Sequence, residues 1–235
     1  MKYAAYCGTR NIYGDMETAA KSLIYNSDVD KVFFVIEDDE FPTELPPLVH
    51  CVNVSGQEFF KPDGPNMKSQ YTYMAMMRIA LCHVLPDVDR VLSLDCDTIV
   101  QRDASAVWDM PIDDCYFSAT PEWHRSAHGL QYCNAGVTLF NLEKMRDGKA
   151  DECIEVLNKH FLRWVEQDVA NYLCLGRIHE MPAYYNGNEW TNHNNPDVVI
   201  KHYAGVPGHQ WRNRAEVMHW RNMPWEEVMK RHGGS

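Results

Sequence analysis

The chain has 235 residues, 45% of them hydrophobic, which is enough to bury one large core, and we expect a single domain over residues 1–235. Its formal net charge of -11 argues against a general nucleic-acid binder, because neutralising phosphates requires clustered Lys and Arg. No stretch approaches the roughly 18 to 20 apolar residues of a transmembrane helix, and the first residues lack the apolar core of a signal peptide. We therefore expect a cytoplasmic protein.

Strand-like and helix-like segments alternate from the first residue, which predicts an α/β fold with helices covering a sheet. Residues 2–7, 32–37 and 49–54 read as strands. A helix is expected after the polar turn at 8–14, with Asp15 as its N-cap. Residues 55–69 contain two glycines and two prolines and predict a loop.

A helix is expected over about residues 70–85, and Arg78 lies on its apolar stripe four residues after Met74. An arginine directed inward requires an anion. One interpretation is a salt bridge to a local acid, with Asp95 as a candidate. The other is a phosphate contact or the orientation of metal ligands. The sequence leaves both open.

The run VLSLDCDTIV, residues 91–100, is an apolar strand pattern that contains two acids, Asp95 and Asp97. If both acids lie in a strand, they point the same way, about 6.6 Å apart at Cα, while Cys96 points into the core. Unpaired carboxylates within a core element would be costly, and a bound divalent ion removes that cost. Oxygen ligands suit Mg²⁺ or Mn²⁺, so the run predicts a metal site.

Strands are expected at 115–119 and 137–141, helices at 150–163 and 167–175, and a helical tail over about 212–235. Asn134, Ala135 and Gly136 directly precede the strand at 137–141. Small residues beside an asparagine indicate close approach of the backbone to a ligand, although a β-bulge would use Gly136 equally well. The pattern places the acidic site at the carboxyl edge of the sheet, where open α/β folds bind nucleotides.

With these motifs in this order, the chain resembles glycosyltransferase family 8, from Tyr3 to about Trp211. The resemblance implies a GT-A fold, a Rossmann-like nucleotide-diphospho-sugar transferase domain on a mixed sheet. It also implies retaining transfer of a hexose from a UDP-sugar, with dependence on Mn²⁺. Asp95-Cys96-Asp97 matches the family's Asp-x-Asp motif, and His202 matches the histidine that completes its metal site. An imidazole beside carboxylates shifts the preference from Mg²⁺ toward Mn²⁺.

The resemblance also implies contacts with the donor. Tyr13 resembles the tyrosine that stacks on uracil, and Arg78 matches the arginine that precedes the metal motif. Glu122 falls where the family has an acid that contacts sugar hydroxyls. The remaining residues that it implies around the nucleotide and the donor sugar are Gly8, Thr9, Asn11, Asn134, Ala135, Gly136, Glu166, Gln167 and Gly205.

The run Glu166-Gln167-Asp168 resembles the family's acidic run at a helix start, although the first acid is usually Asp. Gln167 matches the position below the sugar, and an amide is a poor nucleophile. We therefore expect attack on the same face as the departing diphosphate. Gln167 and Asn134 would stabilise the oxocarbenium-like state, with Arg78 and Glu166 beside them as further catalytic candidates.

One position departs from the family. A lysine that grips the diphosphate usually follows the histidine and glycine, but Gly208 occupies its place and His209 comes next. Either His209 or a nearby arginine such as Arg212 substitutes for the lysine, or diphosphate binding is weaker. The missing lysine keeps open a UDP-sugar-binding or glycan-binding module without turnover. The paired acids keep open a metal-dependent nucleotidyltransferase.

The donor is expected to be UDP-glucose or UDP-galactose, and the acceptor a saccharide, glycolipid or glycoprotein bound by variable loops. From Lys201 onward the chain carries six Lys or Arg against three Asp or Glu, together with three tryptophans. This pattern is compatible with an anionic acceptor or peripheral contact with a membrane. Packing of C-terminal helices on the domain explains the same tryptophans.

Overall fold

The computed structural model describes residues 1–69, 71–126, 129–191 and 197–232. In this part of the chain, one sheet has seven strands in the order β3-β2-β1-β4-β7-β6-β8. The strands are β1 (Tyr3–Cys7), β2 (Lys31–Ile36), β3 (Val49–Asn53), β4 (Arg90–Leu94), β6 (Phe117–Pro121), β7 (Cys133–Asn141) and β8 (Ile178–Glu180). The first four run parallel, whereas β7 is antiparallel to β4 and β6, so the sheet is mixed.

A second, two-stranded antiparallel sheet joins β5 (Thr98–Val100) to β9 (Ile200–His202). Its register places Thr98 opposite His202. Because β5 follows β4 after a short turn, this pairing brings a histidine from late in the chain to the end of the central strand β4. The pairing therefore positions the candidate metal site.

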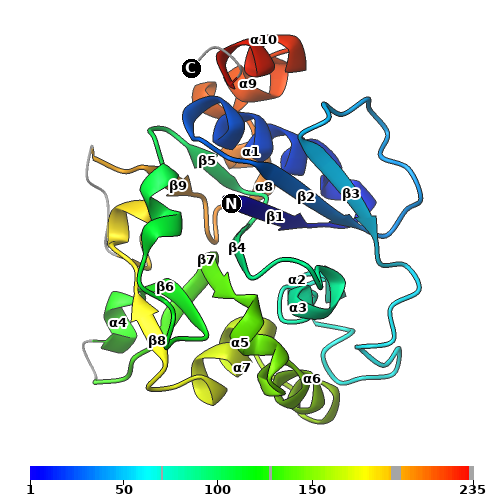
Figure 1. The fold of residues 1–235 in the computed structure, drawn as a ribbon, viewed down its shortest axis with the longest axis vertical. Helices are drawn as coiled ribbons and strands as arrows, with labels where there is room; N and C mark the ends of the chain where they lie inside the picture. Colours follow the sequence, from blue (N-terminus) through cyan, green and yellow to red (C-terminus); the bar gives the residue numbers. More distant parts are fainter. Residues whose placement is uncertain (70, 127–128, 192–196, 233–235) are drawn as a thin grey trace.

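Helices cover both faces of the main sheet (Figure 1). On one side, α1 (Tyr13–Asn26) packs against α9 (Ala215–Asn222) and α10 (Trp225–His232). The other side carries α2 (Tyr73–Met76), α3 (Leu81–Val84), α5 (Leu142–Arg146), α6 (Lys149–Lys159) and α7 (Val165–Leu173). Short elements complete the described chain: α4 (Trp123–Ser126), α8 (Gly208–Trp211), and the 3-10 helices η1 (Arg10–Ile12), η2 (Ser105–Asp109) and η3 (Ala183–Tyr185).

The apolar residues of the central strands form one core on each face of the sheet. In β2, Val32, Phe34 and Ile36 join the core under α1, whereas Phe33 and Val35 join the core under α3 and α6. This alternation follows from the two-residue period of a strand. Strands buried on both faces read as continuous apolar runs, which is why these segments could be recognised in the sequence.

The prediction of one helix over residues 70–85 is wrong in detail, because the structure has two short helices, α2 and α3, joined by an irregular turn. Gln70 lies outside the described residues. Within the turn, the Arg78 amide donates to the Ala75 carbonyl and the Ile79 amide to the Met76 carbonyl, which are three-residue bonds of the 3-10 type. The apolar stripe is nevertheless buried, since Met74, Met77 and Leu81 are at most 1% exposed.

Asp15 is not the N-cap that the sequence predicted. The helix α1 begins at Tyr13, so Asp15 lies inside its first turn, where it is buried and bonded to two arginines. Two other boundaries also differ from expectation: α6 ends at Lys159, and β7 already begins at Cys133. Propensity alone did not predict these boundaries, because long-range contacts decide them.

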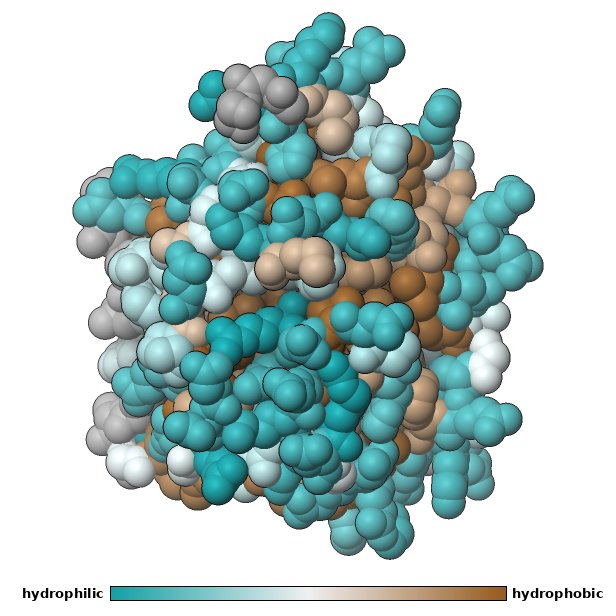
Figure 2. Space-filling model, viewed as in Figure 1, coloured by the Kyte–Doolittle hydropathy of each residue, from teal (hydrophilic) through white to brown (hydrophobic). Residues whose placement is uncertain are grey.

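The C-terminal residues form the two helices α9 and α10 up to His232, and 233–235 lie outside the described residues. Trp220 packs against Tyr25 of α1, with ring centroids 5.1 Å apart, so this tryptophan serves packing. Figure 2 shows one face of the molecule as largely hydrophilic, with hydrophobic atoms gathered in a band across its middle. No helix of the described chain is both long and apolar enough to span a bilayer.

Candidate active site

Asp95 and Asp97 lie in the tight turn between β4 and β5, and not within one continuous strand as the sequence predicted. The Thr98 hydroxyl donates to the Asp95 carbonyl at 2.7 Å and closes the turn. The turn brings both carboxylates to the same histidine, so the predicted convergence holds although the backbone differs. Cys96 is half-buried and packs against the core under α1, as expected, and it also lines the cavity beside the acids.

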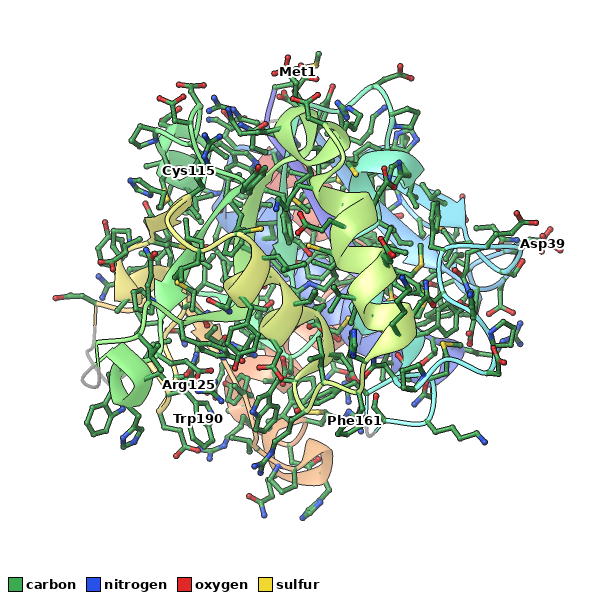
Figure 3. The ribbon with its side chains drawn as sticks, turned by 90° about the horizontal axis from the view of Figure 1, so that it is seen from below. Met1, Asp39, Cys115, Arg125, Phe161 and Trp190 are labelled. Carbon is green, nitrogen blue, oxygen red and sulfur yellow. The ribbon has the colours of Figure 1, made fainter. Side chains whose placement is uncertain are left out.

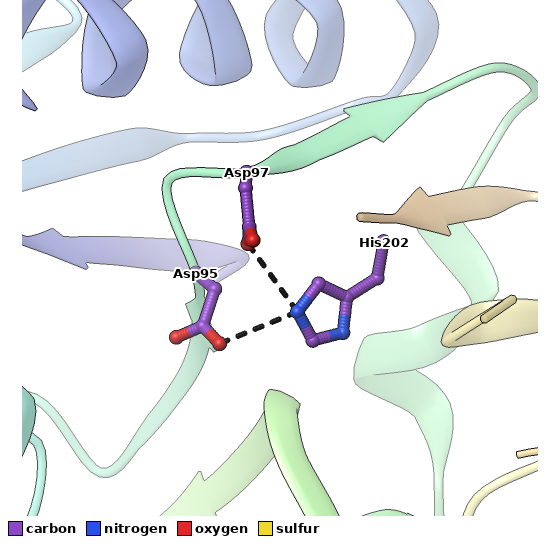
Figure 4. A group of neighbouring side chains, drawn as sticks. All are labelled: Asp95, Asp97 and His202. Atoms are coloured by element: carbon purple, nitrogen blue, oxygen red, sulfur yellow. Dashed lines mark ion pairs between the residues drawn. The ribbon is translucent and has the colours of Figure 1, made fainter. Parts of the chain in front are cut away.

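His202 Nε2 lies 3.4 Å from Asp95 Oδ2 and 3.3 Å from Asp97 Oδ1 (Figure 4). One ligand atom from each of the three residues lies within 4.8 Å of the others. On the other side of the ring, Nδ1 is 2.8 Å from the side-chain oxygen of Asn186, which is fully buried. That oxygen favours a proton on Nδ1, so Nε2 is the nitrogen that faces the two acids and could bind a metal.

Gly136 is required by the position of His202. A Cβ added at residue 136 would lie 1.9 Å from His202 Cε1, so no other residue fits without displacing the ring. The Gly136 carbonyl also accepts a hydrogen bond of 2.8 Å from the Asp95 amide. Pairing between β6 and β7 shifts register at this point, so the glycine serves both a bulge and a close approach.

The charges of the three residues depend on one another. Burial by itself would lower the pKa of His202, but Asp97 and Asp95 together raise it to about 9. Burial by itself would raise the pKa of Asp95, but Arg78 and His202 lower it to about 2. Without a metal, a protonated imidazole therefore neutralises part of the acid pair. The same acids attract any other cation that fits between them.

Arg78 forms an ion pair with Asp95, one of the two interpretations that the sequence left open. Its Nη1 lies 2.7 Å from Asp95 Oδ1, and its Nε donates to the Ser93 hydroxyl at 3.1 Å. The remaining nitrogen donates to the Ala135 carbonyl. A guanidinium with three acceptors is fixed in place, so Arg78 orients Asp95 with respect to His202. Ser93 and Asn186 were missed by sequence reasoning, because neither belongs to a recognisable motif.

Two amide side chains form a network at the start of β7. Gln167 Oε1 accepts a bond of 2.9 Å from the Ala135 amide, and Gln167 Nε2 donates to Glu122 at 3.0 Å. Asn134 Nδ2 donates to the same Glu122 oxygen at 3.2 Å, while its Oδ1 accepts from the Gly136 amide. Each amide is therefore held in one orientation, with Glu122 between them.

Glu166 lies in the first turn of α7 beside Arg78, at a distance of 3.5 Å. Burial raises its pKa to about 7 despite the lowering effect of Arg78. Its Oε2 is buried and makes no hydrogen bond with the residues that the structure describes. The preceding Val165 has a φ of 29°, a strained conformation for a β-branched residue, and marks the entry into this helix.

These residues surround a cavity of about 680 Å³. The predicted site residues that line it are Arg78, Asp95, Cys96, Asp97, Glu122, Asn134, Ala135, Gly136, Glu166, Gln167, His202 and Gly205. Its wall also includes aromatic side chains that the sequence did not predict, namely Tyr71, Trp164, Trp190 and Trp211. Trp190 and Arg125, both of which line the cavity, are labelled in Figure 3. A cavity of this size is typical of small-molecule sites.

The other predicted nucleotide contacts do not line the cavity. Tyr13 is 2% exposed, its ring is stacked on Phe41 with centroids 4.9 Å apart, and its hydroxyl donates to Asp38. Gly8, Thr9 and Asn11 are also absent from the wall; the same segment contributes Cys7, Ile12 and Asp15 instead. Their roles in nucleotide binding stay predictions.

His209 is exposed and does not line the cavity, whereas Gly208 and Arg212 do. The two substitutes that the sequence left open for the missing lysine are therefore placed differently. Arg212 directly follows α8, and its guanidinium is bonded to Asp15 of α1 at 2.5 Å.

The donor set fits a divalent cation. Two carboxylates and one imidazole are ligands of Mn²⁺ and Mg²⁺, and the imidazole favours Mn²⁺. The Asn186 oxygen on Nδ1 and the Arg78 guanidinium on Asp95 fix two of the three ligands from behind, which is the usual second layer of a metal site.

The sequence matches the family model described as glycosyl transferase family 8 over residues 16–227. The chain belongs to this family. It is 26% identical over 189 residues to a lipopolysaccharide 1,2-glucosyltransferase of Escherichia coli, covering 62% of this chain and 55% of that protein. The chain spans between 48% and 65% of the length of the curated relatives it matches.

Solved structures share the fold. The galactosyltransferase LgtC, in complex with donor and acceptor sugar analogues, superposes with a TM-score of 0.66 at 20% identity, over 99% of this chain and 95% of that one. The glycosyltransferase GlyE of Streptococcus pneumoniae TIGR4 superposes with a TM-score of 0.72 at 18% identity, over 98% and 63%. The GT-A fold expected from the sequence is thereby confirmed.

Proposed function

We propose that this chain is a retaining glycosyltransferase that transfers a hexose from UDP-glucose or UDP-galactose to a saccharide, glycolipid or glycoprotein. One observation carries the proposal. In a chain of family 8, Asp95, Asp97 and His202 converge on one point in the wall of a cavity large enough for a small molecule. The structural likeness to LgtC, which was solved with donor and acceptor sugar analogues, supports a sugar donor in that cavity.

Asp95, Asp97 and His202 would hold Mn²⁺, with Mg²⁺ as the weaker alternative. When bound there, the ion supplies charge neutralisation for the diphosphate that leaves the anomeric carbon. Arg78 fixes the Asp95 carboxylate, and Asn186 fixes the imidazole tautomer, so the ligands are preorganised. Ligands that are already in place need not reorient during the reaction, so reorientation adds nothing to the activation barrier.

Gln167 and Asn134 are proposed to lie beneath the donor sugar. The Gln167 oxygen is already engaged by the Ala135 amide, and its nitrogen by Glu122, so this amide is poorly suited to attack the anomeric carbon. The arrangement supports same-face attack by the acceptor. In this mechanism Gln167 and Asn134 hold the Glu122 carboxylate in place, and the dipoles of the two amides stabilise the oxocarbenium-like state.

The acceptor is proposed to enter beside the aromatic rings that line the cavity. Trp190 is 40% exposed, and its backbone carbonyl accepts a bond of 3.0 Å from the Trp123 amide, so the two indole-bearing segments adjoin. Large exposed indoles offer an apolar surface with a polar edge, which suits a sugar ring. This placement supports a saccharide portion in the acceptor.

The test is release of UDP from UDP-glucose and UDP-galactose with Mn²⁺, compared with release of pyrophosphate from UTP. We expect UDP release, and its loss in Asp97→Ala or after chelation. Pyrophosphate release without UDP release would establish a nucleotidyltransferase instead. Mn²⁺-dependent binding of UDP-sugar without hydrolysis or transfer to any saccharide would establish a binding module.

A further inference from the structure

A buried carboxylate on α1 binds two arginines from the C-terminal part of the chain. Asp15 is 4% exposed, and its two oxygens lie 2.5 Å from Arg212 Nη2 and 2.6 Å from Arg221 Nη2. Arg212 Nε also donates to it, at 3.0 Å. One negative charge thus faces two positive charges, and the cluster carries an excess positive charge beside the cavity.

In this cluster, Arg212 is the arginine that lines the cavity and has an unused guanidinium donor. Asp15 occupies Nε and Nη2, while Nη1 makes no hydrogen bond with any described residue. The Arg212 side chain is 38% exposed and lines the cavity. The hydrogen bond to Asp15 raises the pKa of Arg212, burial lowers it, and Asp97 raises it further, so the guanidinium lies within the field of the metal-site acids.

The other two arginines of the cavity wall, Arg78 and Arg125, are held differently from Arg212. Arg78 donates to Asp95, Ser93 and Ala135. The guanidinium of Arg125 lies over the Tyr132 ring, 3.7 Å from its centroid, and pairs with Glu122. Arg78 is therefore fully engaged, whereas Arg125 and Arg212 keep donors that bond no described residue. Of these two, Arg212 is the one that hydrogen bonds to a buried carboxylate fix in place.

Gly208 makes room for this guanidinium. A Cβ at residue 208 would lie 2.8 Å from Arg212 Nη1 and 3.1 Å from Cζ. Because Asp15 anchors the opposite edge of the guanidinium, Arg212 could not retreat without weakening that ion pair. The glycine thus allows Arg212 to occupy the space that a larger residue at 208 would fill.

We propose that Arg212 binds the diphosphate of the donor, that Asp15 holds it in position, and that Gly208 admits it to the cavity. This inference rests on the proposed function and chooses Arg212 over His209, the two substitutes for the missing lysine that the sequence left open. A guanidinium can donate two parallel hydrogen bonds to phosphate oxygens, and its charge complements the anion. Asp15 acts through Arg212 and is a positioning residue.

The test compares the affinities of UDP and UMP by calorimetry with Mn²⁺ present, because the ratio of the two isolates the second phosphate. We expect Arg212→Ala to lower UDP affinity roughly 10- to 100-fold, the range of a lost charge-assisted hydrogen bond, and to change UMP affinity much less. Gly208→Ala should weaken UDP in the same direction by a smaller factor. Arg212→Lys should recover part of the ratio, since the charge is kept and the second donor is lost.

Two arginine variants serve as controls. Arg221→Ala removes the other partner of Asp15, and Arg214→Ala removes an exposed arginine of the same segment; neither residue lines the cavity. Arg214→Ala should leave the UDP-to-UMP ratio within about 2-fold of wild type. Arg221→Ala, which removes one charge of the cluster but no residue of the cavity wall, should lower the ratio by less than Arg212→Ala does. A merely structural role for Arg212 would lower thermal stability in Arg212→Ala and Arg221→Ala alike without changing the ratio.

An unchanged ratio in Arg212→Ala, with wild type binding UDP, would overturn this inference and leave the proposed function standing. A ratio that falls in His209→Ala and not in Arg212→Ala would also overturn it. Absence of Mn²⁺-dependent UDP binding in wild type would overturn the proposed function together with the inference.

Discussion

The substitution Gly136→Ala tests the metal site without removing a ligand. The added Cβ would lie 1.9 Å from His202 Cε1, whereas ordinary contact begins at 3.4 Å, so the two atoms must separate by about 1.5 Å. The imidazole is 5% exposed and bonded to Asn186, and the Gly136 carbonyl is bonded to the Asp95 amide. Either the ring or the strand must therefore move, and both movements displace a ligand.

Metal coordination tolerates deviations of only about 0.2 Å, so a shift of this size should remove His202 from the ligand set. We expect Mn²⁺ affinity to fall about 10- to 100-fold or more, the range found when the support of a ligand is lost. The overpacked site should also cost about 1–3 kcal/mol of stability. Because Gly136 is not among the glycines with positive φ, the effect should come from steric contact rather than from backbone strain.

The assay is a Mn²⁺ titration by calorimetry, paired with UDP release at increasing Mn²⁺ and with thermal unfolding of the metal-free chain. Gly14→Ala is the matched control, because a Cβ there meets nothing within 4 Å. In the first turn of α1 it should be neutral or stabilise by up to about 1 kcal/mol. If Gly136→Ala bound Mn²⁺ as tightly as the control, the ligand role of His202 or its fixed position would be refuted.

Two further substitutions test the charges around Arg78. Arg78→Met should destabilise the chain by about 3–5 kcal/mol, because it removes the guanidinium that pairs with Asp95 and Glu166. Added Mn²⁺ should recover part of this loss. Denaturant unfolding with and without Mn²⁺ measures the destabilisation and the recovery. Glu166→Gln tests the raised pKa of this carboxyl, which titrates near 4.5 in the unfolded chain and at about 7 in the folded chain. Between these two values the folded chain binds more protons than the unfolded chain. The stabilising contribution of the carboxyl therefore falls as pH rises through that window. We therefore expect Glu166→Gln to stabilise the chain more at pH 8 than at pH 5, by up to about 3 kcal/mol. Equal effects in thermal unfolding at both pH values would argue against a raised pKa for the buried Glu166 carboxyl.

Local pattern predicted much of the fold. The strands β1 and β2 are largely apolar runs because both of their faces are buried, and that requirement is written into consecutive residues. The edge strand β3 is mostly exposed and carries a weaker pattern. The acids of the candidate metal site could also be recognised, since two carboxylates at the end of an apolar run are costly without a cation. Pairing His202 with them relied on the family resemblance, because a lone histidine carries no such signal.

The sequence by itself determined which chemistry the chain could offer: paired acids, a histidine, and amides beside small residues. The tertiary structure decided how these groups are used. Asp15 was interpreted as a helix cap from its neighbours, but its partner Arg212 lies 197 residues away, and no periodic pattern encodes so distant a contact. Likewise, residue 136 must be glycine because the His202 ring packs against it. The two residues are far apart in the sequence, and only the packing of the whole fold brings them into contact.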